Sequence, residues 1–221
     1  MKLTVVIPAF NEGKNIGGVI RKIRESIDAN IIVVDDGSKD NTYLSAKEAD
    51  ENVVILRHTI NLGKGAALKT GCQAALMLGA EVIALMDADG QHSPEDLKKI
   101  TEKLGKENLD IVFGARGINK KMPVIKWLGN RFLTRISNLF SGISLTDTQS
   151  GLKVFKASVY EKIAWRSSDY AVETEIIINA GRNNLTYAEV PIQTIYKDNY
   201  KGTNIIDGLK ILLNILKQKF L

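Results

Sequence analysis

Short apolar runs alternate with stretches of helical periodicity through residues 1–115 of this 221-residue chain. The helical stretches place apolar residues three or four positions apart, as at Ile16, Val19, Ile20 and Ile23. The apolar runs are Leu3–Ile7, Ile31–Val34, Val53–Leu56, Val82–Met86 and Asp110–Gly114. Strands that alternate with helices over short loops predict an α/β fold, in which helices flank both faces of a mostly parallel sheet.

Polar residues follow three of the expected strands. Pro8 comes after the first run, and we expect it to end the strand because proline cannot donate to a ladder; the polar turn Ala9–Gly13 follows it. Asp35 and Asp36 follow the second run, and Asp87 and Asp89 follow the fourth. Open α/β sheets bind ligands beyond the carboxyl ends of their strands. The sequence therefore predicts that these loops lie along one sheet edge, where a nucleotide site can be built.

Asp87 and Asp89 are one residue apart, so in an extended segment their side chains point the same way. Two nearby carboxylates repel each other, and a divalent cation between them removes that conflict. We interpret the pair as a metal site that holds a pyrophosphate. The alternative is a plain polar turn, since Asp and Gly are common turn residues. His92, three residues after Asp89, precedes the helix start at Ser93, and we expect it to have a surface or capping role.

The second half of the chain is less regular. It begins with a basic loop that contains Lys120, Lys121 and Lys126. The elements expected after it are helices at Trp127–Ile143, Ala171–Ala180 and Thr203–Leu221, a short strand within Leu145–Phe155, and a strand at Thr186–Ile195. No repeat or linker interrupts the chain, so we expect one domain.

Composition limits the choice of partners and compartment. The net charge of +5 and the pI of about 9.1 suit an anionic partner. The sequence lacks the aromatic and basic interleaving of nucleic-acid binding modules, and no Gly-x-Gly-x-x-Gly follows the first strand. Cys72 is the one cysteine, so a reducing compartment is expected. No run of eighteen apolar residues occurs, so we expect no membrane-spanning helix.

Several short motifs occur in order along nearly the whole chain. They are Val6–Glu12, Val34–Asp40, Asn61–Gly65, Asp87–Gln91, Asp147–Lys153, Glu173–Glu175 and Glu189–Ile192. The first four resemble a family 2 inverting glycosyltransferase with the Rossmann-like GT-A fold. The later three are similar to the dolichol-phosphate mannosyltransferase branch and its polyprenyl-phosphate relatives. The resemblance implies one GT-A domain over residues 1–221, with a nucleotide-binding half at 1–115, an acceptor half at 116–202 and an amphipathic helix at 203–221.

The resemblance also implies a nucleotide-diphospho-sugar donor, carrying GDP or UDP and a mannose, a glucose-type hexose or N-acetylglucosamine. The nucleotide-binding positions that carry over are Pro8, Phe10, Glu12, Asp35, Asp36, Lys64 and Asp87. Asp87, Asp89 and Gln91 are the implied ligands of Mg²⁺ or Mn²⁺, which prefer such oxygen donors. Which of Asp35 and Asp36 faces the base is open, and Phe10 could equally be a core aromatic.

The implied acceptor is a polyprenyl or dolichyl phosphate at the cytoplasmic face of the membrane, with Asp89, Asp147 and Arg116 as the catalytic group. Such a phosphate is already anionic, so positively charged residues that position it matter more than a general base. Arg116, Arg131 and Lys201 are the implied phosphate-binding positions, and the loop lysines either assist or are simply solvated. Asp147 is either a base or the partner that orients Arg116.

The stretch Tyr196–Asn204 departs from the family pattern, because lysines stand where an arginine is usual and the two side chains are not equivalent. This leaves the sugar and the details of the acceptor open. Helices at 127–143 and 205–221 carry cationic residues beside apolar ones, as interfacial helices do, although both could instead pack within the protein. The alternatives to a lipid acceptor are a saccharide or protein hydroxyl, and a non-catalytic role in binding nucleotide sugars.

Overall fold

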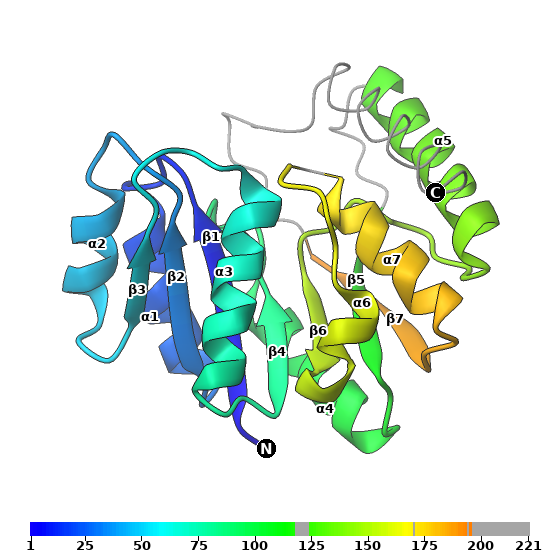
Figure 1. Cartoon of the computed structure of the whole chain (residues 1–221), viewed down its shortest axis with the longest axis horizontal. Coiled ribbons are helices and arrows are strands. Elements are labelled where there is room, and N and C mark those ends of the chain that lie inside the picture. Colours follow the sequence, from blue (N-terminus) through cyan, green and yellow to red (C-terminus); the bar gives the residue numbers. More distant parts are fainter. Residues whose placement is uncertain (118–123, 170, 194, 196–221) are drawn as a thin grey trace.

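A sheet of seven strands runs through the molecule in the order β3-β2-β1-β4-β6-β5-β7 (Figure 1). The computed structural model describes residues 1–117, 124–169, 171–193 and 195. The strands are β1 (Leu3–Ala9), β2 (Asn30–Asp35), β3 (Val54–Arg57), β4 (Val82–Leu85), β5 (Ile111–Arg116), β6 (Lys153–Lys156) and β7 (Tyr187–Ile192). All neighbouring strands are parallel except β6, which runs antiparallel to both β4 and β5.

Helices cover both faces of this sheet, which confirms the predicted α/β class (Figure 1). One face packs against α1 (Ile16–Ser26), α2 (Thr42–Ala49) and α4 (Pro94–Lys106). The other packs against α3 (Lys64–Met77), α6 (Tyr160–Ile163), which follows the 3₁₀ turn η1 (Ala157–Val159), and α7 (Val172–Arg182). Strands buried on both sides need apolar residues at successive positions, which is why the runs are continuous rather than alternating. Cys72 is buried in the core on the α3 side of the sheet.

Pro8 does not end the first strand, contrary to the expectation from sequence. Strand β1 continues to Ala9, and Pro8 is paired in register with Val34 of β2. The Val6 carbonyl accepts from Met86, so Val6 and, two residues on, Pro8 both face β4. Strand β4 ends at Leu85, so the missing N–H of Pro8 costs no ladder hydrogen bond.

Strand β6 lies between β4 and β5, so the second half of the chain completes the sheet of the first half. Its register pairs Lys153 with Leu85 at the carboxyl end of β4. Because β6 is antiparallel, the segment that precedes it arrives at the edge of the sheet where β4 ends. The Asp-Thr-Gln-Ser-Gly motif, residues 147–151, is therefore delivered to the loop that carries Asp87.

Helix α5 (Val124–Ser141) lies at the margin of the molecule and packs against α7 (Figure 1). Leu133 is buried there beside Ala171 and Ile178, whereas Phe132 and Leu139 are 55% and 82% exposed. Among the helices of the described ranges, we find none with the length and apolar character that crossing a bilayer demands. The expected helix at Thr203–Leu221 lies outside the described residues.

Candidate active site

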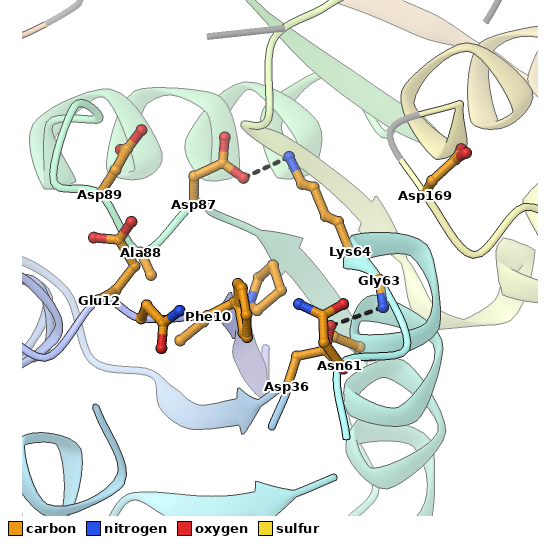
Figure 2. Close-up of a pocket in the computed structure, with 14 residues that line it drawn as sticks. Phe10, Glu12, Asp36, Asn61, Gly63, Lys64, Asp87, Ala88, Asp89 and Asp169 are labelled. Atoms are coloured by element: carbon orange, nitrogen blue, oxygen red, sulfur yellow. Dashed lines mark hydrogen bonds and ion pairs between the residues drawn. The ribbon is translucent and has the colours of Figure 1, made fainter. Parts of the chain in front are cut away.

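A pocket of about 600 Å³ opens at the carboxyl ends of β1, β2 and β4, as the sequence predicts (Figure 2). It is lined by Pro8, Ala9, Phe10, Asn11, Glu12, Asp36, Asn61, Gly63, Lys64, Ala67, Asp87, Ala88, Asp89 and Asp169. All the predicted nucleotide-binding residues line it except Asp35. The loops after three strands therefore form one composite site, because parallel strands bring their carboxyl ends to the same edge.

Asp87 is paired with Lys64 across the pocket (Figure 2). The Lys64 Nζ lies 2.6 Å from Asp87 Oδ1 and 2.8 Å from Glu173 Oε1. Burial alone would raise the pKa of Asp87, but the positive charge of Lys64 and the neighbouring imidazole of His92 hold it well below its usual range. Asp87 is thus an anion that already accepts one cation, the lysine ammonium.

Asp89 lies beside Asp87 on the same loop, and its Oδ1 accepts from the Gln91 backbone N–H at 2.9 Å. Burial and the negative charge of Asp87 raise the pKa of Asp89 above its usual value. The two carboxylates therefore carry opposite pKa shifts, the pattern expected of like charges held close together. A divalent cation between the two carboxylates would relieve this repulsion, as the sequence predicts.

A divalent cation fits the chemistry of this pair, because hard oxygen ligands suit Mg²⁺ and Mn²⁺. Within residues 1–117, 124–169, 171–193 and 195, no group of three or more His, Cys, Asp or Glu side chains is arranged to hold a metal ion. Asp87 and Asp89 would thus supply only part of a coordination shell. Mg²⁺ is commonly held in this way, by one or two carboxylates together with substrate phosphate oxygens.

The absence of a side chain at Gly151 lets the Asp147–Gly151 segment approach Asp87 closely. A Cβ atom added at Gly151 would lie 2.0 Å from Asp87 Oδ2, so only glycine leaves room for the carboxylate. The motif thus has a steric reason for its glycine, beyond turn formation. Gly151 was not among the site residues predicted from sequence.

Asp36 lies at the other end of the pocket and organises the glycine-rich turn Asn61–Gly65. Its Oδ1 accepts from Leu62 N–H at 2.9 Å and contacts His58 Nδ1 at 2.6 Å, and its Oδ2 accepts from Gly63 N–H at 2.8 Å. His58 is thereby held between Asp36 and α3, since its other nitrogen lies 3.0 Å from Thr70 Oγ1. The structure also distinguishes the two neighbouring acids: Asp36 lines the pocket and Asp35 does not.

Asp35 points away from the pocket. Its Oδ1 accepts from Ser38 N–H at 3.0 Å, and its Oδ2 lies 3.0 Å from Nε of Arg57. Alternation along an extended segment sends neighbouring side chains to opposite sides, which accounts for the difference from Asp36. The predicted nucleotide contact of Asp35 remains a prediction, and its observed contacts hold the loop after β2.

Phe10 is not a core aromatic, because it is 41% exposed and lines the pocket. Glu12 also lines the pocket, where its Oε2 accepts from Asn15 at 2.7 Å. The lining residues that the sequence does not predict individually are Ala9, Asn11, Asn61, Gly63, Ala67, Ala88 and Asp169. Asp169 is the most distant in sequence, and its Oδ1 accepts from Ser167 Oγ and Ala171 N–H. An Asp just before a helix was the available signal for it.

The loop at 165–169, from the second half of the chain, is hydrogen-bonded to the glycine-rich turn. Gly65 N–H donates to Ser168 O at 2.8 Å, and Trp165 Nε1 donates to Gly65 O at 2.8 Å. Gly63 has φ of +97° and an added Cβ there would lie 2.2 Å from Ser168 O. Both the left-handed backbone and the close approach require glycine.

Arg116 and Asp147 form a bidentate ion pair outside the pocket lining. Arg116 Nε lies 2.7 Å from Asp147 Oδ2, and Arg116 Nη2 donates to Oδ1 at 3.0 Å. Backbone N–H groups of Arg116 and Gln149 donate to the same carboxylate. Burial alone would raise the pKa of Asp147, but Arg116 and these hydrogen bonds hold it below its usual range. The observed geometry is that of an orienting partner for Arg116.

The other predicted site residues are spread more widely. Gln91 does not line the pocket, and its backbone carbonyl accepts from Ile195 N–H. Arg131 is exposed on α5. Lys120, Lys121 and Lys201 lie outside the described residues, as does the side chain of Lys126. The roles proposed for these residues remain predictions.

His92 is buried rather than on the surface, which corrects the expectation from sequence. It is 6% exposed, and its Nε2 lies 3.6 Å from Asp87 Oδ2. The helix cap is supplied by Ser93, whose Oγ accepts from Glu95 N–H at 3.2 Å. His92 therefore lies close to Asp87 and does not cap α4.

Comparison with known proteins agrees with this geometry. A model of the family described as glycosyl transferase family 2 matches residues 4–164. The chain belongs to glycosyl transferase family 2. The match spans β1 to α6 and thus all the strands that form the pocket edge.

Two relatives of this family member have names that indicate lipid phosphates. One is the UDP-N-acetylglucosamine–dolichyl-phosphate N-acetylglucosaminyltransferase of Methanococcus voltae, which is 37% identical over 97% of this chain and 95% of its own length. The other is the polyprenol monophosphomannose synthase of Mycolicibacterium smegmatis, which is 30% identical over 93% of this chain and 83% of its own.

Among solved structures, the glucosyl-3-phosphoglycerate synthase of Mycobacterium tuberculosis is similar in fold. Its complex with Mn²⁺, UDP-glucose and phosphoglyceric acid aligns with a TM-score of 0.76. The alignment covers 98% of this chain and 79% of the other, at 18% identity. The family 2 chain thus has the GT-A fold that the sequence motifs indicate.

Proposed function

We propose that this glycosyltransferase moves a hexose or N-acetylhexosamine from a nucleotide-diphospho-sugar to a polyprenyl or dolichyl phosphate at the cytoplasmic face of the membrane. The observation that carries the proposal is the strand-edge pocket with Asp87, Asp89 and Lys64 at one end and Asp36 at the other. A base at Asp36 and a diphosphate at Asp87 and Lys64 would use both ends. The names of the two relatives support the lipid-phosphate acceptor.

The charges of the pocket suit loss of a nucleoside diphosphate. A divalent cation bound at Asp87 and Asp89 would neutralise negative charge as it develops on the departing diphosphate. Lys64 lies opposite Asp87 and is the lysine of the pocket lining, so its ammonium can meet a diphosphate oxygen. The exposed face of Phe10 offers an apolar surface against which the nucleoside can lie.

The hydrogen bonds of Asp36 favour a uracil base over guanine. A carboxylate offers about four acceptor positions, and Leu62, Gly63 and His58 already occupy three of those on Asp36. One position remains. Uracil presents a single N–H donor on its pairing edge, whereas guanine presents two adjacent donors that need both carboxylate oxygens. We therefore expect a UDP-sugar donor.

We expect Arg116 to bind the acceptor phosphate, so that the reaction needs no general base. Its guanidinium is fixed by both oxygens of Asp147, and the low pKa of Asp147 keeps that acid anionic and bonded to Arg116. An acid held in this way is a poor base for a hydroxyl. A phosphate acceptor needs no proton removed, which favours the lipid phosphate over a saccharide or protein hydroxyl.

Helix α5 supplies a surface that suits a membrane. Phe132 and Leu139 are exposed on it, together with the cationic side chains of Arg131 and Arg135. The double substitution Phe132→Ser and Leu139→Ser should release the protein from anionic vesicles in a flotation assay. Met77→Ser, at an 88% exposed position on α3, is the matched control and should float like the wild type. Equal flotation of all three proteins would contradict this role for α5.

The proposed function is tested by a donor panel with a short polyprenyl phosphate. UDP- and GDP-linked hexoses and UDP-N-acetylglucosamine are each supplied with Mn²⁺, and the products are resolved by mass spectrometry. We expect transfer from a UDP-sugar, loss of transfer with a chelator, and recovery when Mn²⁺ is restored. Transfer from no donor, or transfer that a chelator leaves unchanged, would overturn the proposal.

A further inference from the structure

A buried row of alternating charges extends from Asp87 into the protein. Lys64 Nζ contacts Asp87 and Glu173 at 2.6 and 2.8 Å, and the ammonium of Lys153 contacts the other oxygen of Glu173. Lys153 is 1% exposed and Glu173 4% exposed, and Lys153 also donates to Ser150 O. The row joins the loop after β4, the start of α3, the first turn of α7 and β6.

The two ammonium groups and two carboxylates of this row have cancelling charges. Burial alone would lower the pKa of Lys64, but Asp87 and Glu173 raise it, so Lys64 stays charged. Burial alone would raise the pKa of Glu173, but Lys153 and Lys64 hold it below its usual value. A buried charge without a partner is strongly destabilising, so each member depends on its neighbours.

The row has a consequence for the proposed cation site, because Lys64 and a divalent cation would both bind Asp87. A cation that takes Asp87 displaces the Lys64 ammonium, which then needs another carboxylate. Glu173 is in place to keep it, at 2.8 Å. Lys153 shares the charge of Glu173 and so limits how strongly Glu173 attracts Lys64.

We propose that Glu173 and Lys153 are positioning residues that set how strongly Lys64 competes with a divalent cation for Asp87. The inference rests on the proposed function only in taking Asp87 as a ligand of the cation. A purely structural role, in which the Lys153–Glu173 pair tethers α7 to β6, would not link either residue to the cation through Lys64. The two roles therefore differ in what happens when Lys64 is removed.

The test is a double-mutant cycle that measures binding of Mn²⁺ alone by electron paramagnetic resonance of the free ion. Glu173→Gln removes the second partner of Lys64, so Lys64 should hold Asp87 more firmly. We expect Mn²⁺ affinity to fall about tenfold, within the range of coupling between contacting residues. In a Lys64→Met background the same substitution should change the affinity less than about twofold. Lys64→Met by itself should strengthen Mn²⁺ binding.

Glu175→Gln is the matched control, because it removes an equal charge from the same turn of α7. Glu175 is 3% exposed, and its carboxylate accepts from Arg166 N–H at 2.7 Å. It should leave Mn²⁺ affinity unchanged. After Lys153→Met, Lys64 is the one remaining partner of Glu173 in the row, so Glu173 should draw Lys64 away from Asp87 more strongly. This substitution should therefore strengthen Mn²⁺ binding only where Lys64 is present. Thermal unfolding of each variant confirms that it is folded.

The outcomes separate this inference from the proposed function. If Glu173→Gln changes Mn²⁺ affinity equally with and without Lys64, charge acts through space alone and the inference is wrong. If Mn²⁺ binds neither the wild type nor Lys64→Met, the inference is also wrong. The titration contains no donor or acceptor, so the cycle can succeed although transfer fails, and transfer can succeed although the cycle fails.

Discussion

Two carboxylate–cation pairs, Asp87 with Lys64 and Asp147 with Arg116, stand at the two ends of the segment 147–151 and differ in how they are held. Asp87 meets Lys64 through one oxygen at 2.6 Å. Asp147 meets Arg116 through both oxygens and also accepts from two backbone N–H groups. A lysine is a point charge that can exchange partners, whereas an arginine fork fixes geometry. The first pair suits a site that must admit a cation and a diphosphate, and the second suits a site that holds a group in place.

The surroundings strengthen this contrast. Glu189 accepts from the backbone N–H groups of Thr146 and Asp147, so the Asp147 loop is anchored on β7. Asp87, in contrast, faces the open pocket, and its neighbour Asp89 has a raised pKa. Changes at Asp89, beside the first pair, should therefore affect turnover more than folding, and changes at the second pair should affect folding as well.

The largest effect is expected from Asp89→Ala. Losing a cation ligand at the leaving diphosphate should lower turnover about 10²- to 10³-fold, the usual cost of removing one charge-stabilising group. The free energy of unfolding in metal-free buffer should change by less than about 0.5 kcal/mol, because the substitution also removes a repulsion. Transfer assays and urea denaturation measure the two quantities. A large loss of stability with near-normal turnover would favour a structural turn.

Asp147→Asn should have a smaller effect on turnover and a larger one on stability. The variant leaves Arg116 without its bidentate partner, and breaking a buried pair costs about 3 kcal/mol. Turnover should fall about tenfold through misplacement of Arg116, with no change in the shape of its pH profile. If turnover is instead nearly abolished while stability is kept, Asp147 is a general base and the acceptor is a hydroxyl.

The smallest expected effect is on acid unfolding, and it concerns the Asp147–Arg116 pair. The folded pKa of Asp147 is lowered, so its pair stabilises the protein above the ordinary pKa of an aspartate, and this contribution is lost as pH falls through the lower, folded value. Between pH 5 and 3 (a window set by ordinary carboxylate pKa values of about 4), Asp147→Asn should therefore lose less stability than the wild type. Urea midpoints across this range measure it. Parallel curves for the two proteins would contradict a stabilising role for the ionised pair.

The sequence predicts the nucleotide half well, because its signals are local. Strands buried on both faces produce continuous apolar runs, and the acids at their ends, such as Asp36 and Asp87, follow directly in the chain. No local signal of this kind predicts that Lys153, Glu173 and Asp169 lie at or beside the pocket. A lysine in a short strand is typical of an exposed position, and only the antiparallel insertion of β6 buries Lys153 beside Glu173.

Pro8 and His92 are two positions at which the prediction from sequence is wrong for a similar reason. Pro8 continues its strand because β4 ends before reaching it, and His92 is buried because the chain turns its ring toward Asp87. Both outcomes depend on where a neighbouring element stops or turns, which no local pattern encodes. The sequence does not decide between the two roles of Asp147 for the same reason, since Asp147 and its partner Arg116 are 31 residues apart.

The central claim is that the Asp87 region binds a diphosphate together with a divalent cation, and calorimetric titration of UDP and UMP tests it most directly. With Mn²⁺ present, UDP should bind at least about tenfold more tightly than in chelator, whereas UMP, which lacks the second phosphate, should change little. Asp87→Asn should remove the gain for UDP. UDP that binds the wild type as tightly in chelator as in Mn²⁺ would contradict the account.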